Sequence, residues 1–202
     1  PLAFLGLALV RTLQEFPQCN ALYDSERNVI SQHEAVHLGI ATQTSDGLKV
    51  PVVRHAEARS LDDLATEIRR VSSAARDNTA SRDELSGSTI TITSLGKLGG
   101  IVSTPVINQP EVAIIGVNRA VERPVVVNGQ VAVRLMMNLS SSFDHRFVAG
   151  KTVHFRENLV EGLFALVIPT ANTSAPLPTN SINLINKYNR WRVLFSFLKD
   201  FP

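Results

Sequence analysis

Three stretches of this sequence have the residue patterns of β-strands, and together they predict a β-sheet. In residues 88–93 threonine alternates with isoleucine, the period of two that puts successive side chains on opposite faces. Residues 112–117 are apolar throughout, and residues 135–142 form a second apolar run that ends in serines. Runs of this length are typical of buried strands. Because strand backbones need hydrogen-bond partners, we expect the three segments to share one sheet.

Helical spacing marks three other segments. Residues 2–16 carry leucines at intervals of three and four, and Pro17 is expected to end that helix. Residues 61–76 repeat the pattern after Ser60, a residue that can cap the first turn. Residues 151–164 show the same spacing near the end of the predicted sheet. The sequence therefore predicts a chain of mixed α and β structure.

Turn signals join the remaining strands. Residues 20–33 are predicted to form a hairpin, and residues 125–133 a second one around an Asn-Gly pair. Residues 36–42 and 48–53 are two further predicted strands joined by a Ser-Asp-Gly turn. Pro51 lacks a backbone donor, so its strand should lie at an edge or break there.

A histidine stands between an acid and a base where the last predicted strand gives way to a helix. Residues 143–150 read Phe-Asp-His-Arg-Phe-Val-Ala-Gly, with the histidine at position 145. Imidazole accepts and donates a proton near neutral pH, so a histidine on such a turn is placed for general base catalysis. On position alone, a solvated or structural histidine is the commoner case. The serines at 140–142 lack the Gly-x-Ser-x-Gly elbow of a serine nucleophile.

The stretch around His145 resembles a family signature. Residues 144–150 are similar to the His-Arg-x-x-Asp-Gly motif of the dihydrolipoamide acyltransferases, the core enzymes of the 2-oxo acid dehydrogenase complexes. Residues 87–96 and 104–114 resemble two further blocks of that family. Shorter matches follow the family order at residues 39–42, 47–53 and 122–124. Several ordered blocks over most of the chain make the resemblance specific.

The resemblance implies a fold and a reaction. The fold would be that of the coenzyme A-dependent acyltransferases, an α/β structure (an α+β two-layer sandwich) in which helices pack on a mixed sheet. Family members form trimers whose active sites lie at subunit boundaries, with coenzyme A and lipoyl-lysine entering from opposite sides. By motif match, His145 is the general base and Thr93 is the hydroxyl that stabilises the oxyanion. Asp144 and Arg146 are expected to form an ion pair that fixes the turn.

One position departs from the signature. Ala149 stands where the family carries aspartate or sometimes asparagine, whose side chain braces the catalytic loop. An alternative function is therefore a catalytically impaired core subunit that only assembles and scaffolds. A third possibility is a free-standing coenzyme A acyltransferase of similar fold. His37 and His55 could form a catalytic pair, but the resemblance gives them no such role.

Length and composition support one domain with a substantial core and exclude some partners. At 202 residues the chain can bury a substantial core, and 19% charged residues argues against disorder. A net charge of +2 with scattered basic residues gives no reason to expect nucleic acid. The single cysteine, Cys19, has no metal-ligand pattern around it, so we predict no metal and a buried, reduced thiol. No segment is apolar for long enough to predict a membrane span.

The chain divides into three predicted parts. Residues 1–164 form the acyltransferase catalytic domain, and the missing initiator methionine suggests a piece of a longer protein with a lipoyl-bearing module upstream. Residues 165–181 have the composition of a linker. Residues 182–202 are an aromatic tail without a family counterpart. Expected partners are a homotrimer, larger assemblies of it, lipoyl domains and other subunits of the complex. The expected location is the bacterial cytoplasm or the mitochondrial matrix.

Overall fold

The structure is a computed structural model that describes residues 1–163 except 95, 97–98, 128, 149–154 and 156. The predicted linker at residues 165–181 and the predicted tail at residues 182–202 lie outside the described residues. Ala149 and the start of the predicted helix at residues 151–164 lie outside them as well. Residues 157–163 are helical, in agreement with that prediction.

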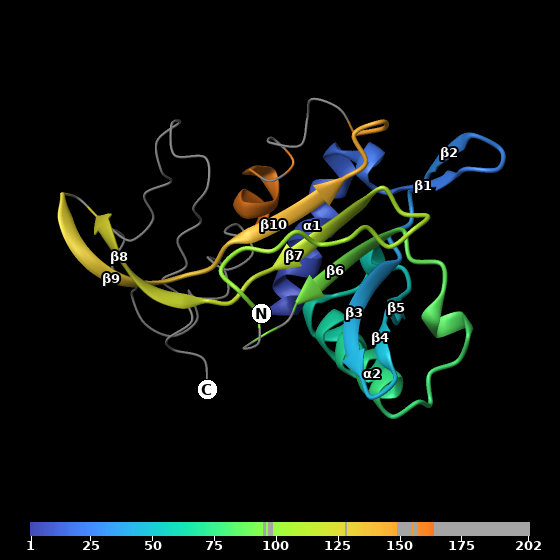
Figure 1. The fold of residues 1–202 in the computed structure, drawn as a ribbon, viewed down its shortest axis with the longest axis horizontal. Helices are drawn as coiled ribbons and strands as arrows, with labels where there is room; N and C mark the ends of the chain where they lie inside the picture. Colours follow the sequence, from blue (N-terminus) through green and yellow to red (C-terminus); the bar gives the residue numbers. More distant parts are fainter. Residues whose placement is uncertain (95, 97–98, 128, 149–154, 156, 164–202) are drawn as a thin grey trace.

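A mixed sheet forms the centre of the molecule, as the sequence predicted (Figure 1). Its strands lie in the order β10-β7-β6-β3-β4, with β5 paired to β3. Strand β6 is parallel to both of its neighbours, whereas β10 is antiparallel to β7. The bounds are β3 Leu38–Thr44, β4 Gly47–Lys49, β5 Val52–Val53, β6 Ile90–Ser94, β7 Ala113–Val117 and β10 Leu139–Phe143.

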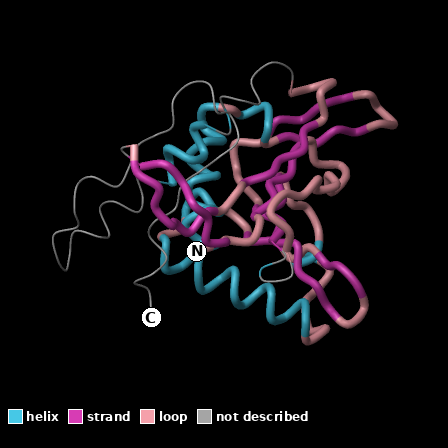
Figure 2. The backbone as a smooth tube through the Cα atoms, turned by 60° about the vertical axis from the view of Figure 1, so that its left-hand side comes forward, coloured by secondary structure: helices cyan, strands magenta, loops and turns pink. Residues whose placement is uncertain are grey.

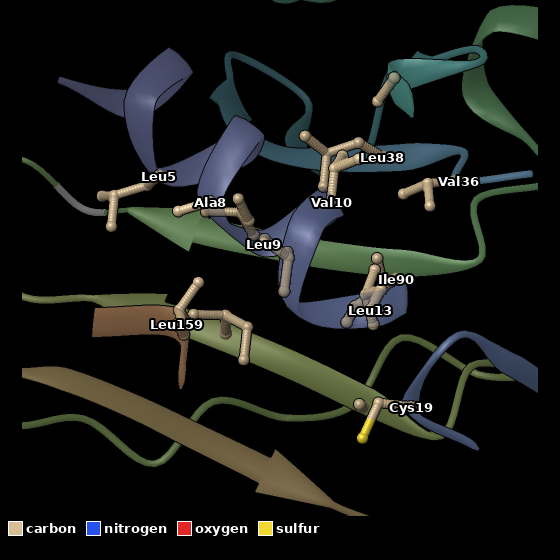
Figure 3. Packing of buried hydrophobic residues seen from close by; sticks show 14 of the residues in the cluster. Leu5, Ala8, Leu9, Val10, Leu13, Cys19, Val36, Leu38, Ile90 and Leu159 are labelled. Carbon is tan, nitrogen blue, oxygen red and sulfur yellow. The ribbon is translucent and has the colours of Figure 1, made fainter. Parts of the chain in front are cut away.

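Helices α1 (Leu2–Glu15) and α2 (Leu61–Arg76) cover one face of this sheet (Figure 2). Leu9 of α1 is fully buried in a cluster that includes Ile90 of β6, and Figure 3 shows their side chains together. Each such buried side chain contributes about 1.5–3 kcal/mol relative to an exposed one. Ser60 caps α2 as predicted, because its hydroxyl accepts a hydrogen bond from the Asp63 amide at 3.2 Å.

Two hairpins extend from the sheet. Strands β1 (Ala21–Asp24) and β2 (Val29–Gln32) form the first, and β8 (Val121–Val127) and β9 (Gln130–Met136) form the second. In each hairpin the two strands pair antiparallel to one another (Figure 1). Both hairpins were predicted from the sequence. Short 3-10 turns at Pro17–Cys19, Ala56–Ala58 and Asp83–Leu85 complete the described elements.

Two predicted strands are broken in the structure. The run at residues 135–142 splits because β9 ends at Met136 and pairs with β8, whereas β10 starts at Leu139 and pairs with β7. The Asn118 side chain binds the Asn138 carbonyl oxygen at 2.9 Å and fixes the break. The run at residues 48–53 divides into β4 and β5, with Pro51 between them as its missing donor predicted.

A buried carboxyl holds the segment that leads into β7. Glu111 is 4% exposed, and its Oε1 atom accepts hydrogen bonds from the Thr91 hydroxyl at 2.8 Å, from the Asn108 amide at 2.8 Å and from the Ser88 hydroxyl. Its Oε2 atom has no partner among the described residues. Burial raises the pKa of this carboxyl above its ordinary value. Glu111 therefore ties β6 to the chain just before β7.

Candidate active site

The turn after β10 presents His145 to solvent. The Asp144 amide donates to the Val112 carbonyl oxygen at 2.8 Å, which fixes the start of the turn beside the start of β7. The amides of Phe147 and Val148 both donate to the Asp144 carbonyl oxygen at 3.0 Å and close the turn. Val148 is 1% exposed and anchors the far side, while His145 stays exposed at the tip. A side chain held this way can exchange protons with a bound substrate.

Asp144 and Arg146 form the ion pair that the sequence predicted. The Arg146 guanidinium donates from Nε to Oδ1 at 3.0 Å and from Nη2 to Oδ2 at 2.6 Å. The Arg146 amide adds a third bond to Oδ1 at 3.1 Å. Hydrogen bonding from Arg146 holds the pKa of the Asp144 carboxyl below its ordinary value. Both side chains flanking His145 are thus turned toward each other, which leaves the imidazole as the free group of the turn.

Aromatic rings support the Arg146 guanidinium from a distant part of the chain. Its Cζ atom lies 4.6 Å from the ring centroid of Tyr23 in β1 and 5.0 Å from that of Phe147. The two rings pack against each other at 4.6 Å between centroids. No sequence signal linked Tyr23 to this turn, because the contact depends on the attachment of the first hairpin to the segment that enters β7.

Thr93 lies near the carboxyl end of β6 and is half-buried. It pairs with Ala41 of β3 on one side and with Gly116 of β7 on the other. Ile92 points into the core beneath the helices, so Thr93 faces the opposite side of the sheet. A side chain at Gly116 would meet the Ser103 hydroxyl at 2.9 Å, so glycine lets residues around 103 cross close to the strand. Thr93 is therefore placed beside a closely approached backbone.

The structure does not bring Thr93 and His145 together within one chain. In the strand register, Thr93 of β6 pairs with Gly116 of β7. Gly116 in turn pairs with Ser140, near the start of β10. His145 follows the other end of that strand, where Phe143 is level with Ala113. Figure 1 shows β10 running opposite to β6 and β7. From the level of Thr93 to the end of β10 is about 10 Å along the strands, and His145 lies beyond that end; β6 and β10 are two strand spacings apart, about 10 Å.

His37 and His55 contact each other but not the turn of His145. Their ring centroids are 4.7 Å apart, and the His55 amide approaches Nδ1 of His37 at 3.3 Å. The His55 ring in turn lies 3.0 Å from a Glu57 carboxylate oxygen. Burial and the nearby Arg54 cation lower the pKa of His37. The pair sits beside β3, three strands away from β10, so within one chain it does not adjoin the turn of His145.

In the described part of the chain, no group of three or more His, Cys, Asp or Glu side chains is arranged to hold a metal ion. Cys19 is fully buried, as predicted, and burial raises the pKa of its thiol to about 12. None of the helices described has the length and apolar character needed to cross a membrane.

Residues 1–163 match the family model of the 2-oxoacid dehydrogenases acyltransferase (catalytic domain). The chain belongs to this acyltransferase family. It is 65% identical over 162 residues to the lipoamide acyltransferase component of the branched-chain alpha-keto acid dehydrogenase complex of Pseudomonas putida. The protein of the same description from Pseudomonas aeruginosa is 60% identical over 162 residues. Both alignments cover 80% of this chain, which spans only 38% of the length of these curated relatives.

Solved structures of acyltransferases in this family share the fold. The dihydrolipoamide acetyltransferase of Azotobacter vinelandii is 36% identical, with a TM-score of 0.74 over 84% of this chain and 69% of that one. The cubic core of a pyruvate dehydrogenase multienzyme complex is 37% identical, with the same TM-score and coverage. The Azotobacter work concerned the catalytic role of a serine, of a histidine 52 positions later and of an asparagine four positions after the histidine. The family and fold that the sequence predicted are thus confirmed.

Proposed function

We propose that this chain is the catalytic domain that moves an acyl group between dihydrolipoyl-lysine and coenzyme A in a 2-oxo acid dehydrogenase complex. The spacing of its site residues carries the proposal. His145 follows Thr93 by 52 positions, and Ala149 follows His145 by four, the same spacing as the serine, histidine and asparagine of the Azotobacter enzyme. Thr93 retains the hydroxyl of that serine, whereas Ala149 loses the amide of that asparagine.

The exposed imidazole and the strand hydroxyl supply the two groups that thioester exchange requires. A thiol becomes a strong nucleophile only as its thiolate, so His145 takes the proton from the coenzyme A sulfur. That sulfur attacks the carbonyl carbon of the acyl-dihydrolipoyl thioester, and Thr93 donates a hydrogen bond to the oxygen that becomes negative. The carbon–sulfur bond to dihydrolipoyl then breaks. Its sulfur leaves with the proton held on His145, so protons and electrons balance.

The separation of Thr93 from His145 supports a site shared between subunits. Both groups must lie within hydrogen-bond reach of one reacting thioester, at about 3 Å. The sheet keeps them far apart within one chain, so the Thr93 that acts with a given His145 belongs to a neighbouring copy. A cyclic homotrimer meets this need with three equivalent sites, and such trimers can build larger assemblies.

The second hairpin offers an apolar surface for a neighbouring copy. Register pairs Val126 with Val131 and Pro124 with Val133, so these four side chains share one face of the hairpin. Val126 is 72% exposed, Val131 is 74% exposed and Val133 is 61% exposed. Contiguous exposed apolar residues of this kind mark protein interfaces. We assign the face to subunit contacts in the trimer.

Acyl transfer from acyl-CoA to free dihydrolipoamide, measured beside light scattering, tests the proposal. We expect transfer by a species of trimer size or larger, and a comparison of acetyl, succinyl and branched-chain acyl-CoA will identify the preferred substrate. An active monomer would contradict the shared site. A trimer with no transfer from any of these acyl-CoA donors would favour the scaffold alternative. The physiological donor would be lipoyl-lysine on a separate module of the complex, in the cytoplasm or the mitochondrial matrix.

Ala149 is the observation that favours the scaffold alternative, and its replacement separates the two functions. Ala149→Asp should raise kcat about fivefold with little change in KM, because one restored hydrogen bond contributes roughly 1 kcal/mol to holding the turn of His145. Ala149→Asn should act in the same direction. Ala149→Val, which adds volume without an acceptor, is the matched control and should not raise kcat.

Steady-state kinetics and thermal unfolding of the three variants give the answer. Unfolding is needed because a larger side chain in a filled space can cost about 1–3 kcal/mol. A parent chain with full activity, unchanged by Ala149→Asp, would show that the carboxylate is dispensable here. A scaffold would assemble normally, and neither the parent nor Ala149→Asp would transfer acyl groups.

A further inference from the structure

An aromatic clamp holds the residue next to His145. We define the Arg146 clamp as Tyr23, Phe147 and the Arg146 guanidinium between Asp144 and these two rings. The guanidinium lies 4.6 Å from the Tyr23 centroid and 5.0 Å from the Phe147 centroid, within the range of cation–π attraction. Asp144 binds the same guanidinium through both carboxylate oxygens. Arg146 therefore contacts the turn through Asp144 and Phe147, and contacts a separate hairpin through Tyr23.

Tyr23 is itself held at both its backbone and its ring. Its amide donates to the Pro110 carbonyl oxygen at 2.8 Å, and its hydroxyl donates to the Asn28 side-chain oxygen at 3.0 Å across the hairpin. Its neighbour Leu22 forms a β-bridge with Glu111. The ring consequently has a fixed position relative to the segment that enters β7.

The same segment holds the turn of His145. Val112 accepts the hydrogen bond from the Asp144 amide, two residues after the carbonyl that holds Tyr23. The catalytic turn and the first hairpin are thus both attached to residues 110–112. The contact between Arg146 and Tyr23 is a second connection between the turn and the hairpin. Among the described residues, the Arg146 side chain without the Tyr23 ring would keep its contacts to Asp144 and Phe147 in its own turn.

We propose that Tyr23 is a positioning residue for acyl transfer, which acts through Arg146 to hold the orientation of the turn that carries His145. This inference rests on the proposed role of His145 as the general base. Tyr23 contacts no reacting atom in this role. Its effect is on the alignment of the base with the substrate thiol, so it should alter kcat and leave ground-state binding of acyl-CoA unchanged.

Two substitutions of Tyr23 separate the ring from the hydroxyl. Tyr23→Leu removes the aromatic face and should lower kcat about tenfold, with KM within about twofold, because a small misplacement of a catalytic group has effects of this order. Tyr23→Phe keeps the face and should retain kcat to within about threefold, since phenylalanine also attracts cations. Val29→Ala, at an exposed position of the same hairpin, is the control for general loosening of the hairpin and should match the parent.

A double variant tests whether Tyr23 works through Arg146. Arg146→Met alone removes the cation, and combining it with Tyr23→Leu should lower kcat no further, because both changes break the same link. If Tyr23 acted independently of Arg146, the two effects on kcat would instead multiply. Rates are compared per folded protein, with thermal unfolding measured for each variant.

The outcomes distinguish this inference from the proposed function. If Tyr23→Leu leaves kcat at the parent value, or if its effect multiplies with that of Arg146→Met, Tyr23 is not a positioning residue. The inference also fails if Tyr23→Phe is as slow as Tyr23→Leu. If His145→Ala keeps parental activity, the proposed function itself fails, whatever the Tyr23 variants do.

Discussion

Replacing His145 with alanine should lower kcat for acyl transfer by at least about 100-fold, the usual contribution of a general base. The reason is that the coenzyme A thiol would lose the group that takes its proton, while its binding surface would stay. The side chain is exposed at the tip of its turn, so its removal leaves no buried cavity. We therefore expect KM and thermal stability to remain close to those of the parent.

A histidine elsewhere on the surface supplies the control. His55 is exposed and adopts a left-handed backbone conformation with a φ of 51°, which asparagine tolerates better than alanine. His55→Asn should keep the parental rate because His55 lies three strands away from the turn and follows β5 at the start of β3, the end of the sheet opposite to Thr93. Parental activity in folded His145→Ala would remove His145 from the mechanism.

Loss of the Thr93 hydroxyl should have an effect of similar size. Thr93→Val keeps the shape and the β-branched side chain that suit a strand, but it cannot donate a hydrogen bond to the oxyanion. One such donor contributes about 3 kcal/mol to the transition state, which corresponds to a fall in kcat of about 100-fold. Because the charge develops only in the transition state, KM for acyl-CoA should change little.

Thr93→Ser is the matched variant that keeps the hydroxyl. It has the residue type found at the corresponding spacing in the Azotobacter enzyme, and it should retain kcat to within about threefold. Steady-state kinetics of both variants, with unfolding curves beside them, decide the role. If Thr93→Val were as active as Thr93→Ser, the threonine would serve only the strand.

The sequence predicted the elements of this fold well where the pattern is local. The alternation at residues 88–93, the helical spacing at residues 61–76 and the hairpin signal at residues 125–133 each depend on near neighbours. The structure has a strand, a helix and a pair of antiparallel strands at these places. The break between β9 and β10 could not be predicted. It arises because two halves of one apolar run pair with different strands, which is a property of the whole sheet.

The sequence predicted which residues form the candidate site, but it did not predict how they are arranged in space. Its position on the turn made His145 a candidate base, and the resemblance added Thr93 and implied that the active site lies at a subunit boundary. Only the strand register showed that one chain keeps them apart. The Arg146 clamp and the buried pairing of Glu111 went unpredicted, because both depend on contacts between segments distant in the sequence. Glu111 does lie in the block at residues 104–114 that resembles the family, so the residue could have been singled out even though its partners could not.

The shared active site is the central claim, and co-assembly of two inactive variants tests it most directly. His145→Ala and Thr93→Val subunits, carrying different affinity tags, are co-expressed and mixed assemblies are isolated through both tags. In a cyclic trimer that contains both variants, an intact His145 meets an intact Thr93 at about one site in three. We therefore predict about a third of the parental acyl-transfer rate from mixed trimers of two variants that are each nearly inactive alone. Mixed assemblies no faster than the separate variants would contradict a site built from two chains.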